Sequence, residues 1–176
     1  MLKRLVAVVL LSTMSCAMVD AAPAVPTIPN CNDDVEYHQL DFWIGDWDTF
    51  DSDTPGGPSI ARTRVEPIAQ GCALHELYTQ SDGLIGDSIL SYDPVPKHWQ
   101  QTWVTNRGSI MVLVGNFKGG ALVLEGASHL KDGKSVVQRI TWEKKGEGVR
   151  ESAVLSKDGG KTWTPAFDVL FVRHKD

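Results

Sequence analysis

The chain has 176 residues, 42% of them hydrophobic, and carries a formal net charge of −5 from 17 basic and 22 acidic residues. This length allows a single domain with a substantial core. The acidic balance offers no basic surface for nucleic acid or anionic lipid, and the composition excludes collagen-like, disordered and disulfide-dense proteins. We therefore expect a globular protein that does not bind nucleic acid.

The N-terminal residues have the pattern of an export signal. Lys3 and Arg4 precede the apolar run Leu5–Leu11, and small residues follow around Ala21. A basic start, a short apolar stretch and small residues at the cleavage point are typical of a secretory signal peptide. The apolar run is short for a membrane span. A retained anchor is the first alternative, and lipidation of Cys16 is the second.

The export pattern divides the chain into three parts. We expect a signal peptide over residues 1–21, a Pro-rich leader over 22–30 and one domain over 31–176. The mature protein is then periplasmic or secreted, without a membrane span; the sequence does not indicate an oligomeric state. Cys31 and Cys72 remain after cleavage, and an oxidising compartment favours a disulfide between them over two buried thiols.

The domain alternates short apolar runs with turns. Turn sequences rich in Gly, Asn, Asp and Pro mostly recur every 10 to 14 residues, which is the spacing of strands in an antiparallel sandwich or barrel. A helical turn is expected over Val35–Ile44, before the first strand. The predicted strands are Trp47–Asp51, Ile60–Ile68, Ala73–Thr79, Ile85–Tyr92, Trp99–Thr105, Ile110–Phe117, Ala121–Ala127, Ser135–Trp142, Val149–Leu155 and Trp163–Val172.

The turn before the last predicted strand fits a structural motif. Ser156, Asp158, Gly160 and Trp163 match the Asp-box pattern S-x-D-x-G-x-x-W. In this pattern the hydroxyl and the carboxylate hydrogen-bond to the hairpin backbone, and the Trp packs beneath it. The motif resembles those of sialidases, but a propeller needs several four-stranded blades, for which this chain is too short. We therefore assign these four residues a structural role.

The sequence contains no pattern of metal ligands or of a catalytic nucleophile. Its five histidines show no HxH, HExxH or Cys/His spacing, and the acidic loop that begins at Asp51 lacks the Glu that closes a calcium loop. No nucleophile elbow, phosphate loop or dinucleotide motif is present. His75 and Glu76 are adjacent on one predicted strand, so they point to opposite faces. We expect neither a metal nor a cofactor.

Alternation along the strands groups aromatic and polar side chains. Trp103 shares a strand face with Gln101, and Tyr78 shares one with Glu76. A closed barrel of about ten strands has an interior wider than side chains readily fill, so inward faces of this kind would form an amphipathic pocket. The alternative is a solid core of Trp residues with the acids outside, because alternation alone does not say which face is inside.

Five motifs distributed along the chain form a recognisable set: His38–Asp48 (HQLDFWIGDWD), Gly71–Glu76 (GCALHE), Tyr92–Pro94 (YDP), Trp99–Trp103 (WQQTW) and Asp158–Trp163 (DGGKTW). Together they resemble an uncharacterised family of exported bacterial proteins, and the resemblance extends over essentially all of the mature chain. It implies an all-β fold, a single antiparallel up-and-down lipocalin-like (calycin) barrel of about ten strands with a short N-terminal helical turn. It implies no settled activity.

The opening motif is also similar to those of two known barrel families. Phe42–Trp47 (FWIGDW) is similar to the G-x-W opening of lipocalins and the L-G-x-W opening of nitrobindins. Nitrobindins hold haem through a His in their last strand. The last predicted strand here, Trp163–Val172, contains no His, and His174 lies beyond it. We therefore do not extend the resemblance to haem binding.

These observations favour a binding function. We expect the barrel to hold a small apolar or amphipathic molecule outside the cytoplasm. One alternative is a barrel enzyme, such as an isomerase, cyclase or hydrolase, with Glu76 or Glu151 as its base. Another is an interaction module whose interior is solid and holds no ligand. The candidate ligand-binding residues are Trp47, Glu76, Tyr78, Gln101, Trp103 and Glu151.

Overall fold

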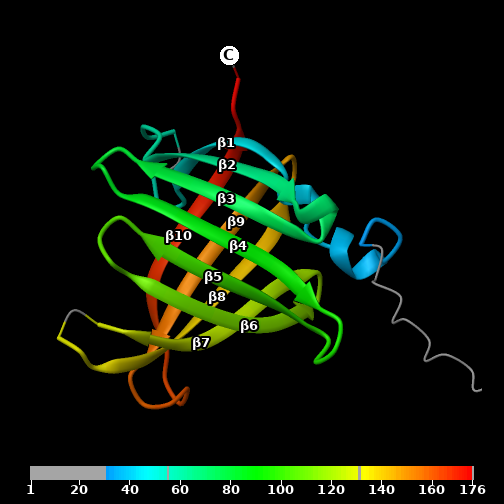
Figure 1. The fold of residues 1–176 in the computed structure, drawn as a ribbon. Coiled ribbons are helices and arrows are strands. Elements are labelled where there is room, and N and C mark those ends of the chain that lie inside the picture. The colour runs from blue at the N-terminus through cyan, green and yellow to red at the C-terminus, as the bar shows by residue number, and fades with distance from the viewer. Residues whose placement is uncertain (1–30, 55, 131, 176) are drawn as a thin grey trace, which may run out of the picture.

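Ten antiparallel strands close into one barrel in the computed structural model, which describes residues 31–54, 56–130 and 132–175 (Figure 1). Each strand is hydrogen-bonded to the next one in the chain, and β1 closes the ring on β10. The predicted up-and-down barrel is confirmed. The strands are β1 (Gly45–Asp51), β2 (Ala61–Ile68), β3 (Ala73–Gln80), β4 (Ile85–Asp93), β5 (His98–Thr105), β6 (Ile110–Lys118), β7 (Ala121–His129), β8 (Ser135–Lys145), β9 (Gly148–Ser156) and β10 (Thr164–Arg173).

The turns use the glycines that marked them in the sequence. Gly83 and Gly108, for example, adopt φ values of 86° and 77° in the turns after β3 and β5. Glycine reaches this left-handed region without the steric cost that a Cβ imposes, so it ends one strand and begins the next within a few residues. The predicted and observed strand limits accordingly agree closely. The largest difference is in β8, which continues to Lys145.

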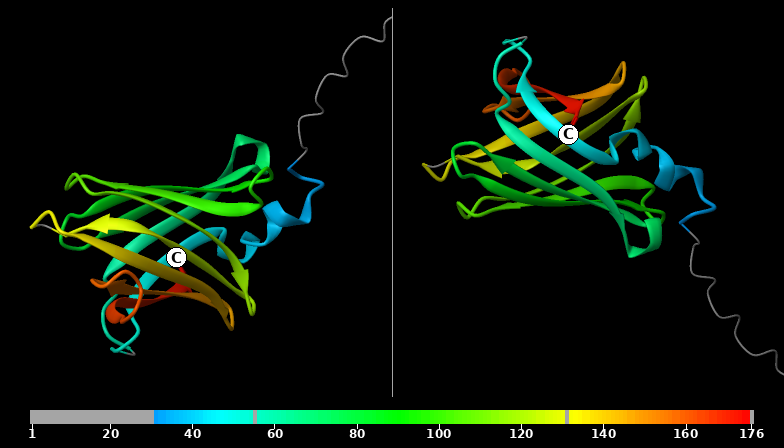
Figure 2. Two further views of the ribbon diagram at one scale, coloured as in Figure 1. Left: turned by 90° about the horizontal axis from the view of Figure 1, so that it is seen from below. Right: turned by 90° about the horizontal axis from the view of Figure 1, so that it is seen from above.

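Short 3-10 helices close one end of the barrel. The predicted helical turn is present as η1 (Val35–His38) and η2 (Asp41–Trp43), which lead directly into β1. A third one, η3 (Ala69–Gly71), connects β2 and β3. Figure 2 shows η1 and η2 against the end of the barrel at which β1 begins. The predicted signal peptide and leader, residues 1–30, lie outside the described residues.

A packed core lies under these helices. Trp43 and Leu40 are fully buried there. The Trp43 ring centroid lies 5.9 Å from those of both Trp142 and Phe171, which are themselves buried. In the part of the chain that the structure describes, no helix has the length and apolar character of a transmembrane helix.

A disulfide fastens the helical segment to the barrel. Cys31 and Cys72 are joined, with their Cα atoms 5.0 Å apart, and they lie 41 positions apart in the sequence. Cys72 follows η3 and immediately precedes β3. The predicted pairing is therefore confirmed, and it holds the start of the described chain beside the closed end of the barrel.

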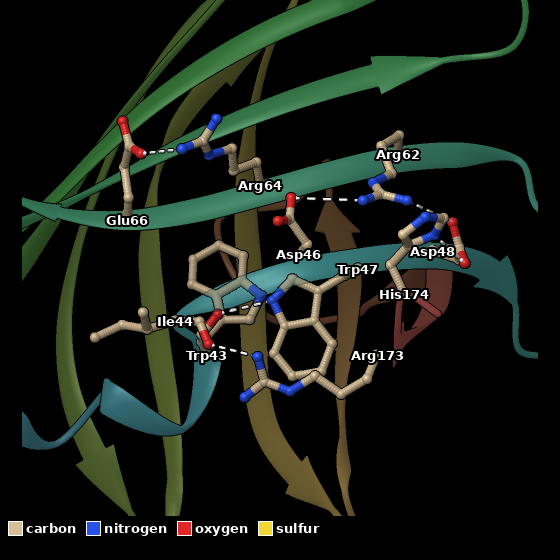
Figure 3. Close-up of polar contacts among 10 residues, drawn as sticks. All are labelled: Trp43, Ile44, Asp46, Trp47, Asp48, Arg62, Arg64, Glu66, Arg173 and His174. Atoms are coloured by element: carbon tan, nitrogen blue, oxygen red, sulfur yellow. Dashed lines mark hydrogen bonds and ion pairs between the residues drawn. The ribbon is translucent and has the colours of Figure 1, made fainter. Parts of the chain in front are cut away.

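The first and last strands are joined at the closed end by an arginine (Figure 3). The Arg173 guanidinium carbon lies 3.9 Å from the centroid of the Trp47 ring, and its Nη1 donates a hydrogen bond of 2.8 Å to the Ile44 carbonyl. A Cβ at Gly45 would overlap the same guanidinium, and Gly45 has a φ of 142°. The Trp47 indole N–H donates to the Trp43 carbonyl at 2.9 Å. Gly45 and Trp47 therefore have a structural role here.

The Asp-box residues organise the turn between β9 and β10. The Ser156 hydroxyl donates to Asp158, whose carboxylate accepts the backbone N–H groups of residues 161 and 162. The Trp163 indole donates to the Gly160 carbonyl at 3.1 Å. Trp163 is half-buried, with the Arg139 guanidinium carbon 4.0 Å from its ring centroid. These contacts hold the turn together and fasten Trp163 against it.

Candidate functional site

The half of the barrel away from the helices is hollow. A cavity of about 1030 Å³ extends from the barrel interior to the loops at that end. Its rim includes residues from four of these loops, Asp53, Leu84, Ser109 and Leu130. These loops follow β1, β3, β5 and β7, so they lie at the end opposite η1 and η2. The interior is therefore packed at one end and open at the other.

Two buried polar side chains form the floor of the cavity, at the boundary with the packed core. Glu76 is 3% exposed and Gln101 is 2% exposed, and both line the cavity. The preceding inward residues on the same strands, Leu74 and Trp99, belong to the core. Tyr78 is the next inward residue after Glu76, and it lines the cavity wall. Successive inward residues along these strands are therefore apolar in the core, polar at the floor and aromatic on the cavity wall.

A serine connects the two floor residues. Ser88 lies directly across from Glu76 in the β3–β4 register, and its hydroxyl stabilises the charged form of that carboxyl group. The Gln101 Nε2 donates to the Ser88 Oγ at 3.3 Å. Gln101 Oε1 is buried and has no hydrogen-bond partner. The floor therefore contains an unsatisfied acceptor beside a carboxylate.

The carboxyl group of Glu76 is easily protonated in this position. Burial raises its pKa from 4.5 to about 7, the hydrogen bond from Ser88 acts in the opposite direction, and the charge of Asp87 adds to the rise. Burial disfavours the charged form because the protein interior solvates a carboxylate poorly. Near neutral pH, Glu76 therefore exchanges between its acid and its anion.

A second carboxyl group approaches the floor from β9. Glu151 lines the cavity, and burial raises its pKa well above 4.5; the negative charge of Glu76 raises it further. Trp142, across from Glu151 in the β8–β9 register, lowers this pKa, although its indole N–H makes no hydrogen bond of normal geometry. Two nearby carboxylates repel each other, so the ionisation of one makes ionisation of the other less favourable. The pair therefore tends to keep at least one proton.

Aromatic rings form one wall above the floor. The Tyr78 and Trp103 ring centroids lie 6.0 Å apart at an interplanar angle of 67°, an edge-to-face contact. Trp103 lies over Gly86, where a Cβ would overlap its ring. The Tyr78 hydroxyl donates to Gln80 at 3.1 Å, and burial with the nearby charges of Glu151 and Glu76 raises the Tyr78 pKa to about 12. Tyr78 therefore stays neutral at ordinary pH.

The lining carries negative charge and little positive charge. Asp51, Asp53 and Asp168 lie with His129 among the outer lining residues. Asp168 is paired with Arg150, which points away from the lining and holds the pKa of that carboxyl below its usual range. Among the lining residues in the described part of the chain there is no Lys or Arg. An anionic ligand would meet no compensating charge there.

Five of the six predicted binding residues line this cavity. Trp47 does not: it is fully buried in the core under Arg173, so its prediction as a ligand-binding residue is corrected. Trp47 points into the barrel, but it lies near the start of β1, at the packed end. The five that line the cavity are Glu76, Tyr78, Gln101, Trp103 and Glu151.

Sequence reasoning missed part of the site. Ser88 is not among the predicted site residues, yet it lies between Glu76 and Gln101 and interacts with both. Met111 and Ile140 supply apolar lining. Strand alternation could have identified this residue, because Ser88 lies an even number of residues from Gly86 on the same strand and so shares its face. The hairpin turn between β3 and β4 then pairs Ser88 with Glu76.

The outer surface of β3 has a separate set of contacts. His75 points outward, and its Nε2 lies 2.9 Å from Asp87 Oδ1. The prediction that His75 and Glu76 occupy opposite faces is therefore confirmed. Within the described ranges, no three His, Cys, Asp or Glu side chains are grouped as metal ligands.

Comparisons with known proteins do not assign this site: no protein-family model matches the chain, and no curated protein is significantly similar to it. The chemistry of the cavity therefore has to be argued from its own residues. They provide an apolar and aromatic wall, a floor of hydrogen-bond acceptors and two carboxyl groups that can hold or release a proton.

Proposed function

We propose that this protein binds a small, partly apolar molecule in the barrel cavity, outside the cytoplasm. The observation that carries the proposal is the hollow half of the barrel, about 1030 Å³ in volume, with an aromatic wall and a buried polar floor. Ligand pockets commonly have volumes of about 300–1,000 Å³, with mostly apolar walls and a few polar groups that orient the ligand. A solid interaction module would have no such cavity.

The aromatic wall supplies enough contact area for useful affinity. One Trp-sized contact buries roughly 150–250 Å², which at about 25 cal/mol per Å² corresponds to roughly 4–6 kcal/mol before the costs of association. The rings of Trp103 and Tyr78 contact each other on this wall. Two such contacts with satisfied polar groups on the floor are consistent with micromolar binding.

The location outside the cytoplasm is supported by two independent features. The order of basic, apolar and small residues at positions 1–21 is that of a signal peptide, and the Cys31–Cys72 disulfide is typical of oxidising compartments. We also propose that the similarity of Phe42–Trp47 to the lipocalin opening reflects a shared barrel architecture. Intact mass of the periplasmic or secreted protein tests the export proposal, with an N-terminus expected near Ala22.

Binding can be tested by intrinsic Trp fluorescence. Titration with a panel of aromatic, terpenoid and fatty molecules is expected to give saturable quenching. Trp103→Ala should weaken it, because this ring lines the cavity, whereas Val104→Ala changes a neighbouring side chain that is 41% exposed on the outer face and should have no effect. No saturation with any member of the panel would contradict the proposal.

A second candidate function is acid–base catalysis in the same cavity. The observation that favours it is the pair Glu76 and Glu151, whose pKa values burial raises toward the range in which a carboxyl group transfers protons. An isomerase, cyclase or hydrolase could use this chemistry. Incubating each panel ligand with the protein and analysing it by mass spectrometry and chromatography separates catalysis from binding. Product formation that Glu76→Gln and Glu151→Gln abolish would favour the enzyme.

A further inference from the structure

The floor of the cavity presents acceptors to a ligand and almost no donors. We propose that its ligand is an amphipathic amine whose ammonium group is held by the carboxylates of Glu76 and Glu151 and the Oε1 of Gln101, with an aromatic or apolar body against Tyr78 and Trp103. The inference rests on the proposed binding function and names the chemical class of the ligand.

One polar atom of the Gln101 amide has a partner and the other has none. The Nε2 donates to the Ser88 Oγ at 3.3 Å. Ser88 lies across from Glu76 and has one hydroxyl proton, which it can offer to the carboxylate form of Glu76. Oε1 is left buried without a partner at the cavity floor. Such an acceptor is costly unless a ligand or water donates to it.

The charge of the lining also favours a cation. Glu76 and Glu151 line the floor, three further carboxylates lie farther out, and no Lys or Arg side chain is among the lining residues of the described chain. The two floor carboxyl groups oppose each other's ionisation, since the charge of Glu76 raises the pKa of Glu151. A bound ammonium removes this repulsion by supplying a positive charge.

Donor number distinguishes an amine from a neutral ligand. A primary ammonium has three N–H donors, one for each of the three acceptor groups, which are the two carboxylates of Glu76 and Glu151 and the amide oxygen of Gln101. An alcohol of the same shape has one O–H donor and no charge. The faces of Tyr78 and Trp103 add attraction for a cation or its apolar substituent.

The site should respond to pH in a defined direction. The groups inside the barrel that interact with Glu76 are Ser88 on β4, Tyr78 on its own strand and Glu151 on β9, and Asp87 acts on it through its charge from the outer face of β4. Tyr78 stays protonated, and burial holds the Glu76 pKa at about 7. Below that pH the floor gains protons and loses the charge that an ammonium requires. Amine affinity should therefore fall as the pH is lowered, while affinity for a neutral analogue should not.

The test compares two probes of equal size by isothermal titration calorimetry, 2-phenylethylamine and 2-phenylethanol. At pH 8 the amine is expected to bind at least about tenfold more tightly, and at pH 5.5 this preference should largely disappear. Glu151→Gln and Glu76→Gln should each remove most of the preference at pH 8, and far-UV circular dichroism of both variants checks that they are folded. Glu147→Gln, at an exposed position in the turn before β9, is the matched control.

Three results would overturn the amine proposal. Equal affinities for both probes at pH 8 would do so, as would an amine preference that survives in both Gln variants. Failure of both probes, with saturable quenching by neutral panel ligands, would also reject it while leaving the binding function intact. If both probes and the whole panel fail, the binding function itself is rejected, so the two failures are distinguishable.

Discussion

The ring of Trp103 fills the space beside Gly86 that a Cβ would occupy, so the aromatic wall of the cavity depends on the absence of a side chain on the neighbouring strand. Gly86 pairs with Tyr78 on β3 and Thr105 on β5. Its backbone is not in the left-handed region, so the backbone conformation does not require a glycine at this position. Its role is therefore to admit the indole ring. Tyr78 then meets that ring edge to face.

Gly86→Ala should displace Trp103 and weaken ligand binding more than it weakens the fold. The added methyl group forces the ring to move, and overpacking of this kind costs about 1–3 kcal/mol of stability. We expect a changed near-UV circular dichroism signal and reduced fluorescence quenching by the ligand panel. Ile89→Ala, at an outward position on β4 that is 49% exposed, is the control. Unchanged quenching by Gly86→Ala would show that the ring position is unimportant.

Glu76→Gln should stabilise the protein at alkaline pH. Because the folded-state pKa of Glu76 is raised from 4.5 to about 7, the folded protein holds this proton more tightly than the unfolded chain. Stability is therefore lost as the pH rises from about 4.5 to 7, by about 3 kcal/mol in total. Gln has no proton to lose, so the variant should exceed the wild type by up to that amount at pH 8 and match it near pH 4.5.

Urea unfolding at several pH values measures this difference. Glu147→Gln should follow the wild type throughout, because Glu147 is exposed. A difference between Glu76→Gln and the wild type that does not vary with pH would mean that Glu76 ionises as freely in the folded protein as in the unfolded chain.

Arg173→Lys should lower stability by about 1 kcal/mol despite preserving the charge. A Lys ammonium cannot both stack on the Trp47 face and donate to the Ile44 carbonyl as the planar guanidinium does. Chemical denaturation of the variant measures the loss. Arg107→Lys, which affects an exposed ion pair with Asp82 at the open end, should change stability little. Equal effects of the two substitutions would argue against a special role for Arg173.

Trp163→Ala should destabilise the β9–β10 hairpin only moderately. Complete burial would predict a loss of about 3–5 kcal/mol, but Trp163 is half-buried and its ring is covered by Arg139. We expect about 1–2 kcal/mol from the lost stacking and packing. Thermal denaturation of Trp163→Ala and Trp163→Phe checks this, with the Phe variant retaining part of the stacking. A loss above 3 kcal/mol would indicate that the ring is buried more deeply than described.

Removing the Cys31–Cys72 disulfide should cost about 4 kcal/mol in the chain-entropy description, since it closes a loop of 41 residues. The double Cys→Ser variant is the substitution to compare in urea unfolding. Mature wild-type protein should also resist thiol labelling until it is reduced. Labelling of both cysteines without reduction would show that the bond is absent.

Local sequence signals sufficed to predict the strands. Glycine turns such as those at Gly83 and Gly108 are specified by residues next to one another, so their positions and the intervening strands could be read directly. Alternation likewise placed Tyr78 with Glu76 and Trp103 with Gln101. These pairs depend only on the two-residue period of a strand.

The position of a residue along the barrel axis could not be predicted in the same way. Trp47 and Trp103 both point inward, yet Trp47 is in the packed core and Trp103 lines the cavity. What separates them is the helical segment, whose Trp43 fills one end of the barrel against Trp142. That packing joins residues about 100 positions apart, and no local period encodes it.

The pairing of β1 with β10 sets the order in which this fold can form. His174 and Asp48 hydrogen-bond at 2.9 Å although 126 residues separate them, and the neighbouring register runs from Trp47 with Arg173 to Asp51 with Val169. A ribosome delivers β1 long before β10, so the growing chain has an unpaired strand edge and no closed core until synthesis is almost complete. Pairing between strands so far apart in sequence is slow to form, and the unpaired edge of β1 is open to association with other chains until the ring closes.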